Sequence, residues 1–252
     1  MKNTLMGVGF LALGCFNVAS AAAACTTGEN VLIDYSSSPN TAPSGTLQNP
    51  GAGSPQFSCG IGTLTFTNFS YELTSGSFTT ATPDVTIEAA TSTGGQDIFE
   101  FDPDIAASSD LLLEFQVTGG IIGADLSAAI TGTGFVNEVV CTVFNSLGIC
   151  PTVDTLAILN ISGNGSSPET VTVGLGAACV GCTTSTAGGN ASVTFSSQSQ
   201  IWLDKDITAG SAAYSEVEQS YDAVVPEPMT FSLIGAGLLG LGLMGRRRSN
   251  LK

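Results

Sequence analysis

Residues 63–67 read Thr-Leu-Thr-Phe-Thr, so polar and apolar side chains alternate one by one. Successive side chains of a β-strand point to opposite faces of a sheet, and this two-residue period therefore predicts a half-buried strand. Shorter stretches with the same alternation lie at 85–88, 98–101 and 171–173. Longer runs that favour strands lie at 111–118, 135–144, 156–161 and 192–203.

The intervals between these runs are rich in Gly, Pro, Ser, Thr and Asn, residues that favour turns and loops. About eight to ten short strands separated in this way predict an all-β domain, either a β-sandwich or a jelly-roll-like fold. We expect this domain to span residues 25–207. The polar residues 208–224 are expected to form a tether, with a short helical turn or stalk at 215–222.

Residues 1–24 have the order of a secretory signal peptide. Lys2 supplies the positively charged start, an apolar run follows at 5–16, and mostly small residues lead to Cys25. This apolar run is shorter than the roughly 20 residues that a membrane-spanning helix needs. We therefore expect cleavage between Ala21 and Cys25, with a lipoprotein signal at Cys15 or Cys25 as the less favoured alternative.

The C-terminal segment combines three parts in a fixed order. Val225, Pro226, Glu227 and Pro228 come first, an uncharged apolar run at 229–245 follows, and Arg246, Arg247 and Arg248 end the segment. The prolines end the preceding structure, the apolar run predicts a transmembrane helix, and the arginines remain cytoplasmic by the positive-inside rule. Because Lys2 is also expected in the cytoplasm, the residues between the two terminal segments are expected to face outward.

This order of parts resembles the PEP-CTERM sorting tail of Gram-negative bacteria. The resemblance covers only about residues 224–248, and the sorting segment itself is expected at 225–248. It implies passage through the secretion machinery, followed by recognition and cleavage by an exosortase. The resemblance also implies a localisation. The ectodomain would first face the periplasm while the tail is held in the inner membrane, and the protein would then be released to the cell envelope or the extracellular polysaccharide.

Residues 25–225 are strongly acidic. All of the 21 acidic residues of the chain except Glu227 lie in this region, whereas its only Lys or Arg is Lys205, so its net charge is about −19. Nucleic-acid binding depends on Lys and Arg side chains that neutralise phosphates, and the composition therefore excludes nucleic-acid partners. Divalent cations or cationic sugars remain as partners, and a soluble acidic surface without a specific ligand is the favoured interpretation.

Once a signal peptide containing Cys15 is removed, an even number of cysteines remains: Cys25, Cys59, Cys141, Cys150, Cys179 and Cys182. Such a set in an exported protein predicts structural disulfides. Six cysteines allow fifteen pairings, and proximity favours Cys25 with Cys59, Cys141 with Cys150, and Cys179 with Cys182. Residues 179–182 also have the C-x-x-C spacing of redox and zinc sites, but no helix that would lower a thiol pKa is evident there, and no second pair completes a zinc site.

The chain contains no His, and residues 25–225 contain no Arg. Ser-His-Asp and Cys-His relays, His-ligated metals and bidentate arginine clamps are therefore excluded. Paired carboxylates, such as Asp102 with Asp104 or Asp204 with Asp206, remain as the acid and base that a glycosidase needs, although any acidic protein offers such pairs. We expect no enzyme, no catalytic residue and no resident cofactor.

Two ligand sites are weaker candidates. Five acidic residues close together in sequence are the candidates for calcium: Asp97, Glu100, Asp102, Asp104 and Asp110. Their spacing fits neither an EF-hand nor a glycine-rich nonapeptide repeat. Trp202, with Tyr71, Tyr214 and Tyr221, offers a sugar-stacking platform, although a lone Trp at the end of an apolar strand is more often part of the core.

Two classes of function remain from the sequence. The favoured one is a structural or adhesive protein of the cell surface or the exopolysaccharide and biofilm matrix. The alternative is a carbohydrate-binding module, with or without Ca²⁺, whose partner would be exopolysaccharide.

Overall fold

The computed structural model describes residues 29–33, 44–48, 58–77, 84–91, 96–103, 105–130, 132–145, 148–164, 169–211 and 214–224. Within these ranges the chain forms antiparallel β-strands and one short 3-10 helix, η1 (Ala187–Gly189), so the all-β prediction is confirmed. The predicted signal peptide 1–24, sorting motif 225–228, transmembrane helix 229–245 and residues 246–248 lie outside the described residues. In the described part, no helix is both long enough and apolar enough to cross a membrane.

Thirteen strands are described. In chain order they are β1 (Glu29–Ile33), β2 (Ser44–Gln48), β3 (Cys59–Ile61), β4 (Leu64–Ser75), β5 (Asp84–Thr91), β6 (Gln96–Pro103), β7 (Ser109–Ile130), β8 (Thr133–Cys141), β9 (Thr155–Asn164), β10 (Thr170–Leu175), β11 (Thr183–Ser185), β12 (Ala191–Ala209) and β13 (Tyr214–Ala223).

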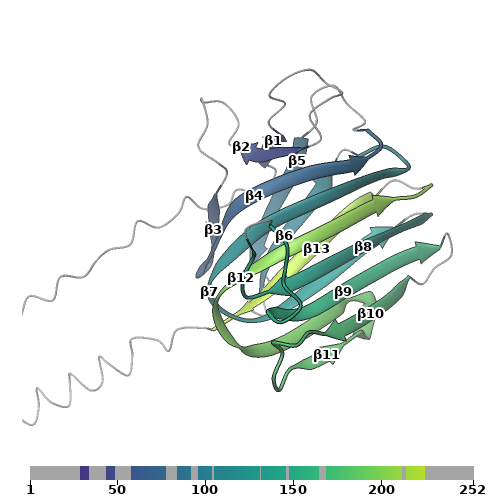
Figure 1. The fold of residues 1–252 in the computed structure, drawn as a ribbon. Helices are drawn as coiled ribbons and strands as arrows, with labels where there is room; N and C mark the ends of the chain where they lie inside the picture. Colours follow the sequence, from purple (N-terminus) through teal and green to yellow (C-terminus); the bar gives the residue numbers. More distant parts are fainter. Residues whose placement is uncertain are drawn as a thin grey trace, which may run out of the picture.

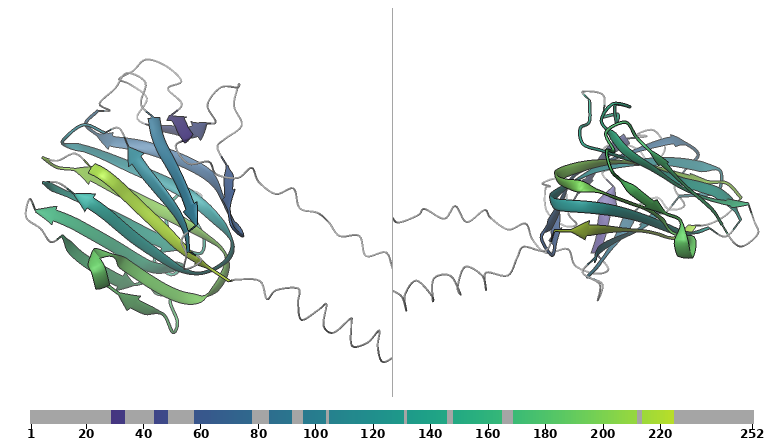
Figure 2. Two further views of the ribbon diagram at one scale, coloured as in Figure 1. Left: turned by 180° about the vertical axis from the view of Figure 1, so that it is seen from behind. Right: turned by 90° about the horizontal axis from the view of Figure 1, so that it is seen from below.

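Two long strands, β7 and β12, organise the sheet. Its order is β10-β9-β8-β12-β7-β13-β6-β5-β1-β2-β4-β3, and β4 also pairs with β7. One edge of β7 pairs with β12, whereas the other edge pairs with β4 along residues 110–118 and with β13 along residues 121–130. The sheet consequently curls around an interior, as Figure 1 and both views of Figure 2 show.

The bends of the sheet fall at identifiable residues. Asn68 has a φ of 58°, and the register of β4 against β7 shifts at this point, so that Phe66 and Phe69 both face the interior. In β7, Gly119 has a φ of 143°, and an added Cβ there would lie 2.6 Å from Leu64 Cδ2. A side chain at Gly119 would therefore clash as well as strain the backbone.

The interior is built by strict alternation along β7. Leu111, Leu113, Phe115 and Val117 are each at most 1% exposed, and the residues between them point outward. The rings of Phe115 and Phe69 stack with their centroids 5.1 Å apart. Each fully buried side chain of this size contributes roughly 1.5–3 kcal/mol of hydrophobic stabilisation.

The C-terminal strand differs from the tether that the sequence predicted at 208–224. β12 continues to Ala209, and β13 pairs with β6 on one side and β7 on the other. Val217, Gln219 and Tyr221 of this strand are fully buried. The polar composition concealed the strand because one of its inward residues, Gln219, is polar and is satisfied by a partner in the interior.

Candidate functional site

Residues 204–206 of β12 distribute their charges to opposite faces of the sheet. The odd-numbered residues Leu203, Lys205 and Ile207 are fully buried, whereas Asp204 and Asp206 are partly exposed on the outer face. This is the ordinary consequence of the two-residue period of a strand. The triplet therefore belongs to two separate sites, one inside the domain and one on its surface.

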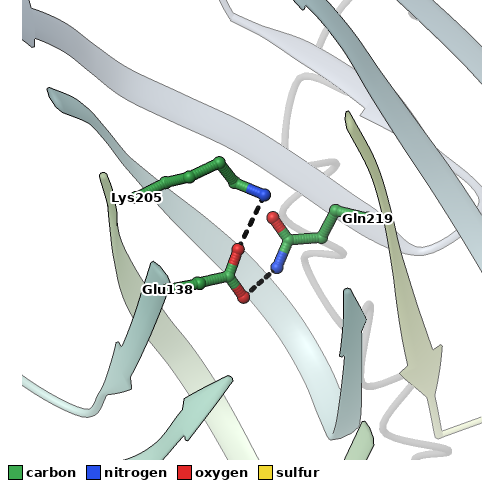
Figure 3. Close-up of polar contacts among 3 residues, drawn as sticks. All are labelled: Glu138, Lys205 and Gln219. Carbon is green, nitrogen blue, oxygen red and sulfur yellow. Dashed lines mark hydrogen bonds and ion pairs between the residues drawn. The ribbon is translucent and has the colours of Figure 1, made fainter. Parts of the chain in front are cut away.

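The inner site is a chain of contacts among three buried side chains from three strands. Lys205 lies directly opposite Glu138 of β8 in the register, and its Nζ lies 2.8 Å from Glu138 Oε2. Gln219 of β13 donates a hydrogen bond from Nε2 to Glu138 Oε1 (Figure 3). Glu138, Lys205 and Gln219 are each 0% exposed.

The contact between Gln219 and Glu138 shows how far the sheet is curled. β13 is three strands away from β8 in the sheet order, which in a flat sheet would be about 14 Å at the usual strand spacing. A direct hydrogen bond is possible only because the strands face one another across the interior. Tyr221 lies two residues after Gln219, and its ring centroid is 5.5 Å from that of Phe66 on β4.

Burial governs the protonation of the inner site. It raises the pKa of Glu138, although the Lys205 charge and hydrogen bonds from Lys205 and Gln219 act in the opposite direction. Burial likewise lowers the pKa of Lys205, despite the nearby carboxylate. Two uncharged partners, an amine and a carboxylic acid, are therefore favoured relative to the same groups in water.

The outer site contains a pair of carboxyl groups that share a proton. Asp110 of β7 and Asp206 of β12 are joined by a side-chain hydrogen bond. Burial and the neighbouring Asp110 raise the pKa of Asp206 to about 7. Burial also acts to raise the pKa of Asp110, but hydrogen bonds from Asp206, Thr74 (2.6 Å) and Thr208 (2.8 Å) outweigh it, so this pKa is lowered.

A second acidic pair lies beside the first on the same face. Burial, followed by the charges of Glu114 and Glu138, raises the pKa of Asp204 to about 6. Burial also raises the pKa of Glu114, which accepts a 2.9 Å hydrogen bond from Ser70 Oγ. Asp204 and Glu114 are opposite one another in the register of β12 and β7. With Lys205 turned inward, no Lys or Arg among the described residues neutralises this face.

An aromatic stack adjoins these carboxyl groups. Trp202 of β12 stacks on Phe144 with ring centroids 4.7 Å apart, and both residues are partly exposed. The structure therefore differs from the core position that the sequence favoured for Trp202. Tyr71 and Tyr221 are buried and face the interior, so these two do not join Trp202 in a platform, and the side chain of Tyr214 is outside the described part.

The loop that carries Phe144 is closed by a disulfide. Cys141 and Cys150 are bonded with their Cα atoms 5.8 Å apart, and Cys179 and Cys182 are bonded with theirs 5.6 Å apart. Both pairings agree with the prediction from proximity. Cys59 is also disulfide-bonded, to none of the other four described cysteines, and Cys25 lies outside the described residues.

The five calcium candidates do not form one group of described side chains. Asp97, Glu100 and Asp102 lie on β6, whose side chains are outside the described part, as is Asp104. Asp110 lies on β7, and β13 separates β7 from β6 in the sheet order. Among the described residues, no three Asp, Glu, Cys or His side chains gather as metal ligands.

The chain was compared with protein families, curated proteins and solved structures. No family model, no curated protein and no solved structure matches it.

Proposed function

We propose that the protein is an exported structural or adhesive component of the cell surface or of the extracellular polysaccharide matrix, built as a β-sandwich-like ectodomain. The observation that supports this proposal most directly is the absence of a basic side chain on the described surface. Lys205 is the only Lys or Arg of the described residues, and it is fully buried. The described surface is therefore acidic and neutral, which favours solubility and disfavours binding to nucleic acids and anionic lipids.

The disulfides support the same compartment. Two loops, 141–150 and 179–182, are closed by disulfides, and such bonds persist in oxidising compartments outside the cytoplasm. In the proposed route, the signal peptide directs export, an exosortase recognises residues 225–228, and the residues 229–248 hold the chain in the inner membrane until it is cleaved.

Mass spectrometry of the protein recovered from its host tests the route. We expect a mature C-terminus close to residues 225–228, without the apolar segment and Arg246 to Arg248. Replacing Pro226, Glu227 and Pro228 with alanine should leave the protein in the membrane fraction, because the apolar segment is intact. Alanine substitutions at Ser249 and Asn250 are the matched control and should leave release unchanged. Released protein that still ends at Lys252 would refute the proposed route.

One observation favours a second candidate function, carbohydrate binding on the outer face. The stack of Trp202 and Phe144 lies beside Asp204, and Gln116 donates a 3.1 Å hydrogen bond to Gln200 on the neighbouring strand. An aromatic ring next to carboxyl and amide groups offers both a stacking surface and polar partners for a sugar.

Sedimentation with the exopolysaccharide of the host tests this second candidate. Trp202→Ala should weaken binding at least about tenfold if one sugar stacks there, since about 1.4 kcal/mol corresponds to a factor of ten. Val180→Ser is the control, because Val180 is 85% exposed at the tip of a different loop. Equal binding by both variants would reject the outer face as the sugar site, and a chelator added in parallel separates Ca²⁺-dependent binding from direct binding.

A further inference from the structure

The inner site brings an amine, a carboxyl group and a carboxamide into one buried chain of contacts. We propose that Lys205 and Gln219 are joined by an intramolecular amide bond between Lys205 Nζ and Gln219 Cδ, with Glu138 as the group that transfers the proton. The proposal is independent of the function assigned above, because it concerns the interior of the domain.

The geometry presents both the amine and the carboxamide to Glu138. One carboxyl oxygen lies 2.8 Å from the Lys205 amine, and the other accepts the hydrogen bond of the Gln219 amide nitrogen. Figure 3 shows the Lys205 amine and the Gln219 amide nitrogen, each joined by a dashed line to a different oxygen of the Glu138 carboxyl group. A carboxyl group in this position is able to take a proton from the attacking nitrogen and give one to the departing nitrogen.

The interior supplies the protonation state that the reaction requires. An amine is nucleophilic only when it is neutral, and burial lowers the pKa of Lys205 while it raises that of Glu138. The three side chains are 0% exposed, so water is excluded from the reacting groups. Fixed neighbours in a dry site also remove the entropic cost of bringing the two reactants together.

The proposed step balances without any further reactant. The lone pair of Lys205 Nζ attacks Gln219 Cδ, and a tetrahedral intermediate forms with the negative charge on Gln219 Oε1. The bond from Cδ to Nε2 then breaks as the protonated Glu138 gives its proton to Nε2, Glu138 takes one proton from Nζ in return, and one molecule of ammonia leaves. Glu138 ends in its starting state, and nothing is oxidised or reduced.

The bond would connect strands that do not pair with each other. Lys205 lies on β12 and Gln219 on β13, and β7 separates these strands in the sheet order. The link would therefore span the interior and fasten the last strand before the C-terminal tail. Unlike the disulfides at 141–150 and 179–182, it would survive reduction.

The mass of the reduced and denatured native protein tests the proposal. We expect a mass lower than that of the mature sequence by one ammonia, and a branched peptide joining Lys205 to Gln219 after digestion by a protease that cuts at Glu216 and Glu218. The full sequence mass would overturn the proposal. The loss of one water instead would place the bond between Lys205 and Glu138 and would overturn the assignment of Gln219 as the acceptor.

Trypsin offers a second readout, because Lys205 is the only site for this protease between residues 25 and 225. The denatured, linked chain should resist cleavage there, because its lysine is no longer a free amine. Gln219→Leu and Glu138→Gln should each restore the full mass and the cleavage, whereas Asp206→Asn on the outer face should not. The mass of the wild-type protein decides the matter even if an inner variant fails to fold, and full cleavage of the wild-type chain would overturn the proposal.

Discussion

Residues 204–206 of β12 place ionisable side chains in opposite surroundings on the inner and outer faces of the sheet. Inside, Lys205 has a carboxyl partner at 2.8 Å and no exposure to solvent. Outside, Asp204 and Asp206 have acidic neighbours, Glu114 and Asp110, and remain in contact with water. The comparison shows that the domain accommodates a buried amine and carboxyl group by pairing them, and neighbouring surface carboxyl groups by letting them share a proton.

The two solutions have different energetic consequences. A buried polar group loses hydration that its partners inside the protein must replace, so the inner pair is sensitive to the loss of either member. Surface carboxyl groups keep part of their hydration and are screened by solvent, so each contributes little.

Removing the inner carboxyl group should have the largest effect. Glu138→Leu leaves the Lys205 amine buried without its acidic partner, and we expect the free energy of unfolding to fall by about 3–5 kcal/mol, measured by chemical denaturation. The triple variant Lys205→Met, Glu138→Leu, Gln219→Leu is the matched control. It should recover most of this loss, because it replaces all three polar side chains of the cluster with apolar ones. If the triple variant is as unstable as Glu138→Leu alone, the loss of stability comes from altered packing and not from an unpaired amine.

Removing the disulfide that closes loop 141–150 should have an intermediate effect on the stability of the domain. Replacing Cys141 and Cys150 with alanine should destabilise the domain by about 2–3 kcal/mol, whereas the shorter loop closed by Cys179 and Cys182 should cost about 2 kcal/mol. Only the first pair should also increase the exposure of Trp202, because its loop carries Phe144. Thermal unfolding and Trp fluorescence measure the two effects, and an unchanged emission spectrum in the Cys141 and Cys150 variant would contradict the second.

The shared proton of the outer face predicts a smaller dependence on pH. The pKa of Asp206 is about 7 and that of Asp204 about 6, above the value of about 3.9 in an unfolded chain. Between about pH 4 and pH 7 the folded state therefore binds more protons than the unfolded state, so the contribution of these groups to stability falls as pH rises.

Asp206→Asn should reduce this dependence when unfolding is measured at about pH 5 and pH 8. The change at each pH should stay below about 1 kcal/mol, because both groups are partly hydrated. Glu169→Gln, near β10 and three strands away in the sheet order, is the control and should keep the dependence of the wild type. A steeper dependence in Asp206→Asn than in the wild type would contradict the shared proton.

For DNA binding we expect no effect at all. The isolated β-domain should cause no shift in a DNA retardation assay even at about 20 mM salt, because counterion release requires exposed cationic side chains. A specific shift would show that the acidic outer face does not prevent the domain from binding DNA.

The sequence predicted the strands wherever the alternation was apolar and polar. The stretch 63–67 coincides with the start of β4 except for its first residue, 111–118 falls inside β7, and the sequence also led to both described disulfides. It did not predict the inner cluster, because Glu138 and Gln219 are far apart in the chain and meet only through the curl of the sheet. The sequence did contain one indication of it. Lys205 lies two residues from each of the apolar residues Leu203 and Ile207, so a strand turns all three side chains to the same face. β13 was missed because its inward Gln219 breaks the apolar pattern that identifies a strand.

The position of β13 has a consequence for the order in which the domain folds. This strand is the last of the described chain, yet it lies between β6 and β7 and supplies Val217, Gln219 and Tyr221 to the interior. The sheet is therefore incomplete until residue 223 has joined it, and pairings between distant segments of a chain form slowly. A chain that becomes available from its N-terminus, during synthesis or in the proposed export, therefore cannot complete this sheet until its final strand is present.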